Sequence, residues 1–164
     1  MKLAIISLGC PKNQADADVF THALLKAGHE TVADPAEADA IIINTCGFIQ
    51  SAKEEATENI LLACQYKQQN PDLKVIVTGC LAERYKSQIA SEMPEVDAVV
   101  GIGSNAALPA ILERVCTPGA GRIESYGPKT DLPLGGARIV STPQHYAYLK
   151  IAEGCSNRCR YCAI

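Results

Sequence analysis

The fold of this 164-residue chain is decided by the stretch Ala38-Asp39-Ala40-Ile41-Ile42-Ile43-Asn44. Its three consecutive isoleucines break any alternation of apolar and polar residues, which predicts a strand buried on both faces. A strand of this kind is typical of a parallel sheet that has helices on both sides. Thr45-Cys46-Gly47 follows directly and predicts a turn at the carboxyl end of the strand.

Strand-like and helix-like segments alternate on both sides of this stretch. Further strands are expected over residues 2–8, 30–33, 73–77 and 96–100. The alternation with helices predicts the α/β class, as a doubly wound parallel sheet with right-handed crossovers. We expect the flavodoxin-like strand order 2-1-3-4-5.

Four helices are expected between these strands. The first covers residues 14–27 and stops at Gly28, and the second starts in a capping box formed by Ser51 and Glu54. The third is expected to place Leu81, Tyr85 and Ile89 on one face. Ser104 is expected to cap the fourth.

The domain organisation follows from where this pattern stops. Residues 1–116 are expected to form an independently folded N-terminal domain. Residues 117–143 are rich in glycine and proline and are interpreted as a linker with a short strand over 122–126. Residues 144–164 open with an apolar strand over 146–152 that has no partner strand in this sequence, so we expect the segment from Thr117 onward to dock only loosely.

Composition narrows the class of protein. The net charge is −3, which gives no basic footprint for nucleic acid. The first residues carry neither a signal peptide nor a run long enough to span a membrane, so a cytoplasmic location without membrane contact is expected. Thiols stay reduced in that compartment, and eight cysteines therefore indicate metal binding or catalysis before disulfides.

A C-x3-C-x2-C triplet, Cys155, Cys159 and Cys162, lies close to the end of the sequence. Three thiols within eight residues can hold an iron–sulfur cluster and leave one iron without a protein ligand. Zinc is the alternative, but a structural zinc site needs four ligands, and no histidine lies near the triplet. The spacing therefore favours an iron–sulfur loop.

Three other cysteines, Cys10, Cys46 and Cys80, each follow a predicted parallel strand. Ligands bind at the carboxyl edge of open α/β sheets, so the three thiols are candidates for one shared metal site. Buried packing of the three, or one disulfide between two of them, is the alternative. Cys64 and Cys116 lie on apolar helix faces and are interpreted as packing residues.

The two cysteine triplets together resemble those of the radical S-adenosylmethionine methylthiotransferases, and the resemblance covers the whole chain. It is closest to the branch that modifies a ribosomal protein. The matching sequences are S-L-G-C-P-K-N (7–13), N-T-C-G-F-I (44–49), S-A-K-E-E (51–55), T-G-C-L (78–81) and Y-A-Y-L-K-I-A-E-G-C (146–155).

The resemblance implies two 4Fe–4S clusters with S-adenosylmethionine as cofactor. Cys10, Cys46 and Cys80 would hold an auxiliary cluster in the α/β domain. Cys155, Cys159 and Cys162 would hold the cluster that binds the cofactor, with Tyr161 in the cofactor site. The strand over 146–152 would be the first of a barrel, so the sequence resembles an N-terminal fragment that is inactive alone.

The activity implied is the addition of a methylthio group to the β-carbon of an aspartate in a small-subunit ribosomal protein. A flavodoxin or ferredoxin would supply electrons, and any nucleic acid contact would be made by a C-terminal domain outside this sequence. The alternatives are a tRNA adenosine methylthiotransferase, and a non-enzymatic iron–sulfur or zinc scaffold. The motifs around Cys10 and Cys46 favour the ribosomal-protein branch over the tRNA branch.

Overall fold

The computed structural model describes residues 1–129, 136–157 and 159–162. The strands are β1 (Lys2–Ser7), β2 (Glu30–Thr31), β3 (Ala40–Thr45), β4 (Lys74–Gly79), β5 (Ala98–Val100) and β6 (Ile123–Ser125). The helices are α1 (Pro11–Lys26), α2 (Gln50–Gln65), α3 (Cys80–Arg84), α4 (Lys86–Glu92) and α5 (Leu108–Val115). Short 3-10 helices are η1 (Pro35–Glu37), η2 (Tyr66–Gln68) and η3 (Ile102–Ala107).

The strands form one six-stranded parallel sheet in the order β2-β1-β3-β4-β5-β6. This confirms the flavodoxin-like order of the first five strands and adds β6 beside β5. The isoleucine stretch is the centre of the sheet: Ile42 pairs with Ile5 of β1 and with Ile76 of β4. Ile41, Ile42 and Ile43 are fully buried, as their uninterrupted apolar run predicts.

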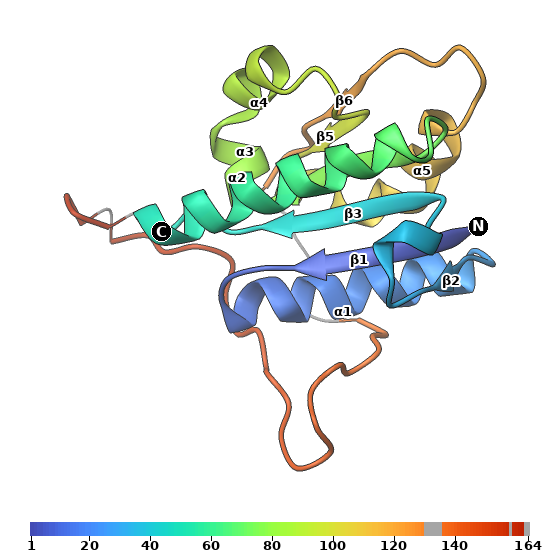
Figure 1. The fold of residues 1–164 in the computed structure, drawn as a ribbon. Coiled ribbons are helices and arrows are strands. Elements are labelled where there is room, and N and C mark those ends of the chain that lie inside the picture. The colour runs from blue at the N-terminus through green and yellow to red at the C-terminus, as the bar shows by residue number, and fades with distance from the viewer. Residues whose placement is uncertain (130–135, 158, 163–164) are drawn as a thin grey trace.

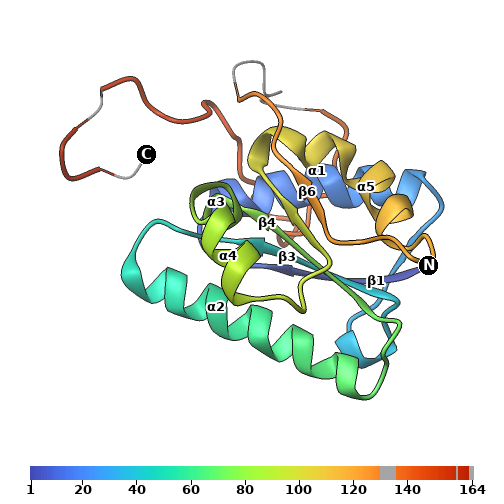
Figure 2. The ribbon, with the colours of Figure 1, turned by 90° about the horizontal axis from the view of Figure 1, so that it is seen from above.

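Alternate residues of the central strands feed two separate cores. Ile41 and Ile43 pack with the apolar residues of α2, α3 and α4. Ile42 packs on the other face, with those of α1 and α5. Figure 2 shows the result, with α2 along one face of the sheet and α1 and α5 along the other. The doubly wound α/β prediction is confirmed.

Two helices begin at other residues than predicted. α1 begins at Pro11, three residues before the expected start, because the fixed φ of proline suits the first helical position. The capping box of Ser51 and Glu54 is wrong: Ile49 stands at the N-cap of α2 without a side-chain cap. Glu54 instead accepts a 3.0 Å hydrogen bond from Gln50 one turn earlier.

The predicted third helix is two helices. Tyr85 (φ −111°, ψ 25°) separates α3 from α4. Its ring lies partly buried against the core beneath α2 and 5.6 Å from the Lys53 ammonium group. Leu81 and Ile89, on either side of the break, are both buried in that core.

The predicted N-cap role of Ser104 is also wrong. Ser104 lies inside η3, and its hydroxyl accepts a 2.7 Å hydrogen bond from the Gly127 N–H and contacts the Ser125 hydroxyl at 3.0 Å. These contacts hold the end of β6 against η3. The presence of β6 confirms the short strand expected over 122–126. The division into residues 1–116, 117–143 and 144–164 stays a prediction, and β6 falls in its middle segment.

Residues 146–152 form no strand, contrary to the prediction. A strand needs a hydrogen-bonded neighbour. The six strands of the described part of the chain pair with one another in the α/β sheet, and none of them pairs with residues 146–152. The segment instead lies beside the start of α1, with Lys150 turned inward, while Leu149 and Ile151 are each 80% exposed. No helix in the described ranges is long and apolar enough to cross a membrane.

Candidate metal centre

Cys10, Cys46 and Cys80 lie at one edge of the sheet, as predicted. Their strands β1, β3 and β4 are neighbours, and the register aligns Ser7 with Asn44 and Thr45 with Gly79 at the carboxyl ends. Cys46 follows β3 directly, Cys80 is the first residue of α3, and Cys10 precedes α1. In Figure 1, β1 and β3 point to the side where α1 begins and where the C-terminus lies.

Two glycines let the three turns approach one another. Gly9 has φ +90°, and a Cβ there would lie 2.8 Å from the Cys46 sulfur. Gly79 has φ +94°, and its Cβ would lie 2.4 Å from the Thr45 carbonyl oxygen. Only glycine adopts this backbone readily and avoids both clashes. The turns before Cys10 and Cys80 therefore pack directly against the turn that carries Cys46.

A buried amide, Asn13, connects all three cysteine-bearing turns. Its Nδ2 donates hydrogen bonds to the carbonyl oxygens of Leu8 (3.1 Å) and Thr45 (2.9 Å). Its Oδ1 accepts one from the Cys80 sulfur at 3.6 Å. The side chain of Asn44 donates in turn to the Asn13 carbonyl oxygen at 2.7 Å.

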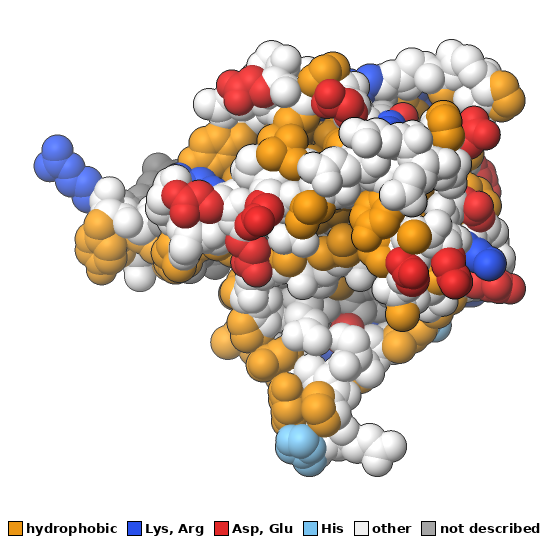
Figure 3. All heavy atoms as spheres, viewed as in Figure 1, with side chains coloured by type: hydrophobic (Ala, Val, Ile, Leu, Met, Phe, Trp, Pro, Cys, Tyr) orange, Lys and Arg blue, Asp and Glu red, His pale blue; other side chains and the backbone are white. Residues whose placement is uncertain are grey.

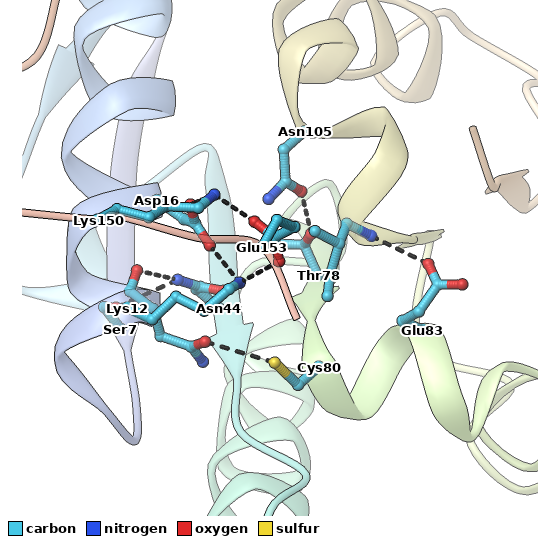
Figure 4. A network of polar contacts seen from close by, with 12 residues as sticks. Ser7, Lys12, Asp16, Asn44, Thr78, Cys80, Glu83, Asn105, Lys150 and Glu153 are labelled. Carbon is cyan, nitrogen blue, oxygen red and sulfur yellow. Dashed lines mark hydrogen bonds and ion pairs between the residues drawn. The ribbon is translucent and has the colours of Figure 1, made fainter. Parts of the chain in front are cut away.

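Sequence reasoning missed this role and read Asn13 only as part of a motif. The available signal was its residue type, because asparagine is a poor residue inside a helix and is used there for a specific hydrogen bond. A second polar chain continues from the same edge into η3. Thr45 donates to the Thr78 carbonyl oxygen (2.5 Å), and the Thr78 hydroxyl donates to Asn105 (2.6 Å), as Figure 4 shows in part.

The electrostatics of the edge show that the three sulfurs influence one another. Cys46 is buried, Cys80 is half-buried and Cys10 is exposed. Burial raises the pKa of Cys80, the nearby Cys46 and Cys10 raise it further, and the Lys12 ammonium group opposes them. The positive charge of a bound metal would favour the thiolate form of Cys80.

The donor set at this edge suits an iron–sulfur cluster, because three thiols from adjacent turns are the ligands that such clusters use. Within the residues that the structure describes, however, no three His, Cys, Asp or Glu side chains are arranged to hold a metal ion. The structure thus brings the three cysteines to one edge but does not assemble them as ligands. Their ligation of a cluster stays a prediction.

The second triplet lies on the surface. Cys155, Cys159 and Cys162 are exposed, and the Cys162 N–H donates to the Cys159 carbonyl oxygen at 3.0 Å, which closes a turn. Tyr161 is 93% exposed, so it does not pack on the α/β domain. The predicted roles of these four residues in cluster and cofactor binding stay predictions.

The two remaining cysteines pack on the cores, as predicted. Cys64 lies against the core beneath α2 and Cys116 against the core beneath α5. Burial raises the pKa of Cys64 to about 11, which keeps it a neutral thiol. Neither lies with the three cysteines of the sheet edge.

The fold and the edge define a doubly wound α/β protein whose carboxyl edge carries three cysteines. The chain belongs to the family described as "Uncharacterized protein family UPF0004", which matches residues 2–101 and so includes Cys10, Cys46 and Cys80. Proteins named "Ribosomal protein uS12 methylthiotransferase RimO" are similar over nearly all of its length. They confirm the resemblance to methylthiotransferases.

Three such relatives give the extent of the similarity. The protein of Acetivibrio thermocellus is 45% identical over 99% of this chain and 37% of its own length. That of Caldicellulosiruptor saccharolyticus is 41% identical over 100% and 37%. That of Solibacter usitatus is 43% identical over 100% and 34%. The chain thus spans little more than a third of the length of these relatives.

Proposed function

We propose that this chain forms the cluster-binding part of an enzyme that methylthiolates ribosomal protein uS12 by radical S-adenosylmethionine chemistry. The observation that carries the proposal is the contact of one buried side chain, Asn13, with the turns of Cys10, Cys46 and Cys80. Close packing of the three turns does not require a cysteine in each of them, at the carboxyl ends of adjacent strands. The names of the relatives supply the reaction and its substrate.

In this proposal the cysteines act as ligands and the rest of the edge positions them. Cys10, Cys46 and Cys80 would hold one 4Fe–4S cluster, and Cys155, Cys159 and Cys162 the other. When bound, the clusters and S-adenosylmethionine supply the sulfur, the methyl group and the radical chemistry. Gly9 and Gly79 permit the close approach of the turns.

Lys12 has an electrostatic role beside the first triplet. Its ammonium group favours a negative charge on Cys80 and so offsets part of the repulsion among neighbouring thiolates. The Tyr161 ring, one residue before Cys162, would border the cofactor.

The substrate atom we propose is the β-carbon of an aspartate, with electrons from a flavodoxin or ferredoxin in the cytoplasm. Figure 3 shows one face of the molecule, on which Lys and Arg side chains are scattered and acidic ones are frequent. The net charge of −3 gives this part no overall basic character of the kind that RNA-binding domains show. We therefore place any RNA contact outside it.

The metal prediction is tested by anaerobic reconstitution with iron and sulfide, followed by Mössbauer spectroscopy and iron analysis. A variant with Cys10, Cys46 and Cys80 all changed to alanine should lose the cluster of the sheet edge. Cys64→Ala is the matched control and should retain full iron. Equal iron in the triple variant and in Cys64→Ala, both tested with the second triplet removed, would exclude a cluster at this edge.

The substrate is tested with a protein that contains this chain and has the full length of its relatives. It is expressed in a bacterial strain that lacks its own uS12 methylthiotransferase. Mass spectrometry should find the methylthio group on an aspartate of uS12 and none newly added to tRNA. Modification of tRNA adenosine alone would move the assignment to the tRNA-modifying branch. Full modification by a Cys46→Ala variant would refute the role of the edge.

A further inference from the structure

Four charged side chains connect the start of α1 to the segment that leads into the second cysteine triplet. Lys12 contacts Asp16 at 2.9 Å within α1 and Glu153 at 2.7 Å across the interface. Lys150 contacts Asp16 at 2.7 Å and also pairs with Glu153. Positive and negative groups alternate around this ring, which Figure 4 shows between α1 and the C-terminal segment.

The ring is mostly shielded from solvent. The side chain of Lys150 is 8% exposed, those of Asp16 and Glu153 are 14% and 16% exposed, and that of Lys12 is 26% exposed. Burial alone would raise the pKa of Glu153, but hydrogen bonds from Lys12 and Lys150 hold it below its ordinary value. Shielded, hydrogen-bonded pairs resist salt and hold geometry better than the exposed pairs of a typical surface.

The sequence positions of the ring place it between the two sets of cysteines. Lys12 follows Cys10 by two residues and Glu153 precedes Cys155 by two. Two residues of extended chain reach at most about 7 Å, so Cys10 lies within that distance of Lys12, and Cys155 within that distance of Glu153, measured between Cα atoms. Alternation along the segment turns Lys150 inward and leaves Leu149 and Ile151 outward.

A second set of contacts joins an earlier part of the same segment, around Ser141, to α1. The Ser141 hydroxyl donates to the buried Asp18 carboxylate at 2.5 Å, and the Ile139 N–H donates to the Asp18 carbonyl oxygen at 3.2 Å. Gln14 donates to the Ser141 hydroxyl at 3.0 Å. The segment therefore contacts α1 at two places, which lie on different sides of the helix because residues two apart are separated by about 200°. These contacts correct the expectation of loose docking.

We propose that Lys12, Asp16, Lys150 and Glu153 are positioning residues that dock the base of the C-x3-C-x2-C loop onto the edge carrying Cys10, Cys46 and Cys80. The docking itself is independent of any bound group. Its consequence, that the two cysteine triplets share one reaction space, rests on the proposed function.

Trypsin tests the docking on this chain directly. The protease must take a lysine side chain into its own pocket, so a Lys150 held in the ring is protected, while the exposed Lys129 and Arg160 are not. Asp16→Asn and Glu153→Gln should each accelerate cleavage after Lys150 by roughly fivefold, since each releases part of a shielded charge network. Cleavage after Lys129 should not change.

The control is Asp72→Asn, which removes an exposed carboxylate from a loop remote from the ring. It should leave cleavage after Lys150 unchanged. Glu153→Gln lies in the segment itself and leaves α1 intact, so its effect cannot come from unfolding of the helix. If trypsin cleaves the unchanged chain after Lys150 as fast as after Arg160, the proposed docking is refuted.

The shared reaction space is tested on a chain extended to the length of its relatives and reconstituted with both clusters. Pulsed electron paramagnetic resonance should detect magnetic coupling between the reduced clusters. The double variant Asp16→Asn, Glu153→Gln should weaken that coupling at unchanged iron content. Unchanged coupling would overturn the positioning role while the proposed function stands. Absence of clusters would refute the proposed function, and the trypsin result would still decide the docking.

Discussion

Replacing Asn13 by alanine should loosen the cysteine edge as a whole. The change deletes the amide that donates to the carbonyl oxygens of Leu8 and Thr45, at a position that is 1% exposed. A buried polar group without a partner costs about 1–3 kcal/mol, so two such carbonyl groups give a loss of roughly 2–6 kcal/mol in the free energy of unfolding. That is a large share of the roughly 5–15 kcal/mol by which proteins of this kind are stable.

Urea denaturation followed by circular dichroism measures this loss. With a slope of roughly 2 kcal/mol per molar urea, the midpoint should fall by about 1–3 M. A second measurement is the alkylation of Cys80, which should become faster because its hydrogen-bond partner at 3.6 Å is gone. Asn13→Asp keeps the size of the side chain but removes both donor hydrogens, so it should destabilise without creating a cavity.

The matched control is Asn59→Ala on α2. Asn59 is half-buried and donates one hydrogen bond, 2.8 Å long and exposed to solvent, to the Glu55 carbonyl oxygen. Because alanine is the better helix former, this variant should change the stability by less than about 0.5 kcal/mol in either direction. The reasoning fails if Asn13→Ala has the same midpoint as Asn59→Ala.

Three further outcomes are expected. Gly79→Ala should lower the stability by at least about 2 kcal/mol in urea denaturation, because the added Cβ meets the Thr45 carbonyl oxygen at 2.4 Å and the backbone has φ +94°; an unchanged midpoint would contradict it. Ile42→Ala should cost about 2–5 kcal/mol by the same measurement, since the side chain is fully buried at the centre of the sheet. Cys64 should resist iodoacetamide at neutral pH, and its rate should rise about tenfold per pH unit up to its pKa of about 11, as read by mass spectrometry.

The features that could be predicted from the sequence are those that short patterns determine. The run of isoleucines over 41–43 is buried in any parallel sheet, and the alternation of strands and helices predicts parallel pairing through right-handed crossovers. Cys10, Cys46 and Cys80 each follow a strand in the sequence, so their common edge follows from the topology alone.

The features that could not be predicted depend on partners distant in the sequence. Asn13 gains its role only when the register brings Leu8 and Thr45, 32 residues from Asn13, within reach of one amide. The pairing of Asp16 with Lys150 joins residues 134 apart. The start of α2 was also misplaced. Ser51 and Glu54 have the spacing of a capping box, but that spacing does not determine where the preceding turn ends.

The position of β6 determines how far the domain can be shortened from its C-terminal side. Arg122, just before β6, donates three hydrogen bonds to the carbonyl oxygens of Ile89, Ala90 and Met93 at the end of α4. A protein shortened to residue 116 would lose these contacts and would leave the apolar strand β5 as a bare edge of the sheet. Exposed apolar edges pair with other chains. An N-terminal domain that ends before β6 should therefore self-associate, and one that continues to Gly127 should stay monomeric.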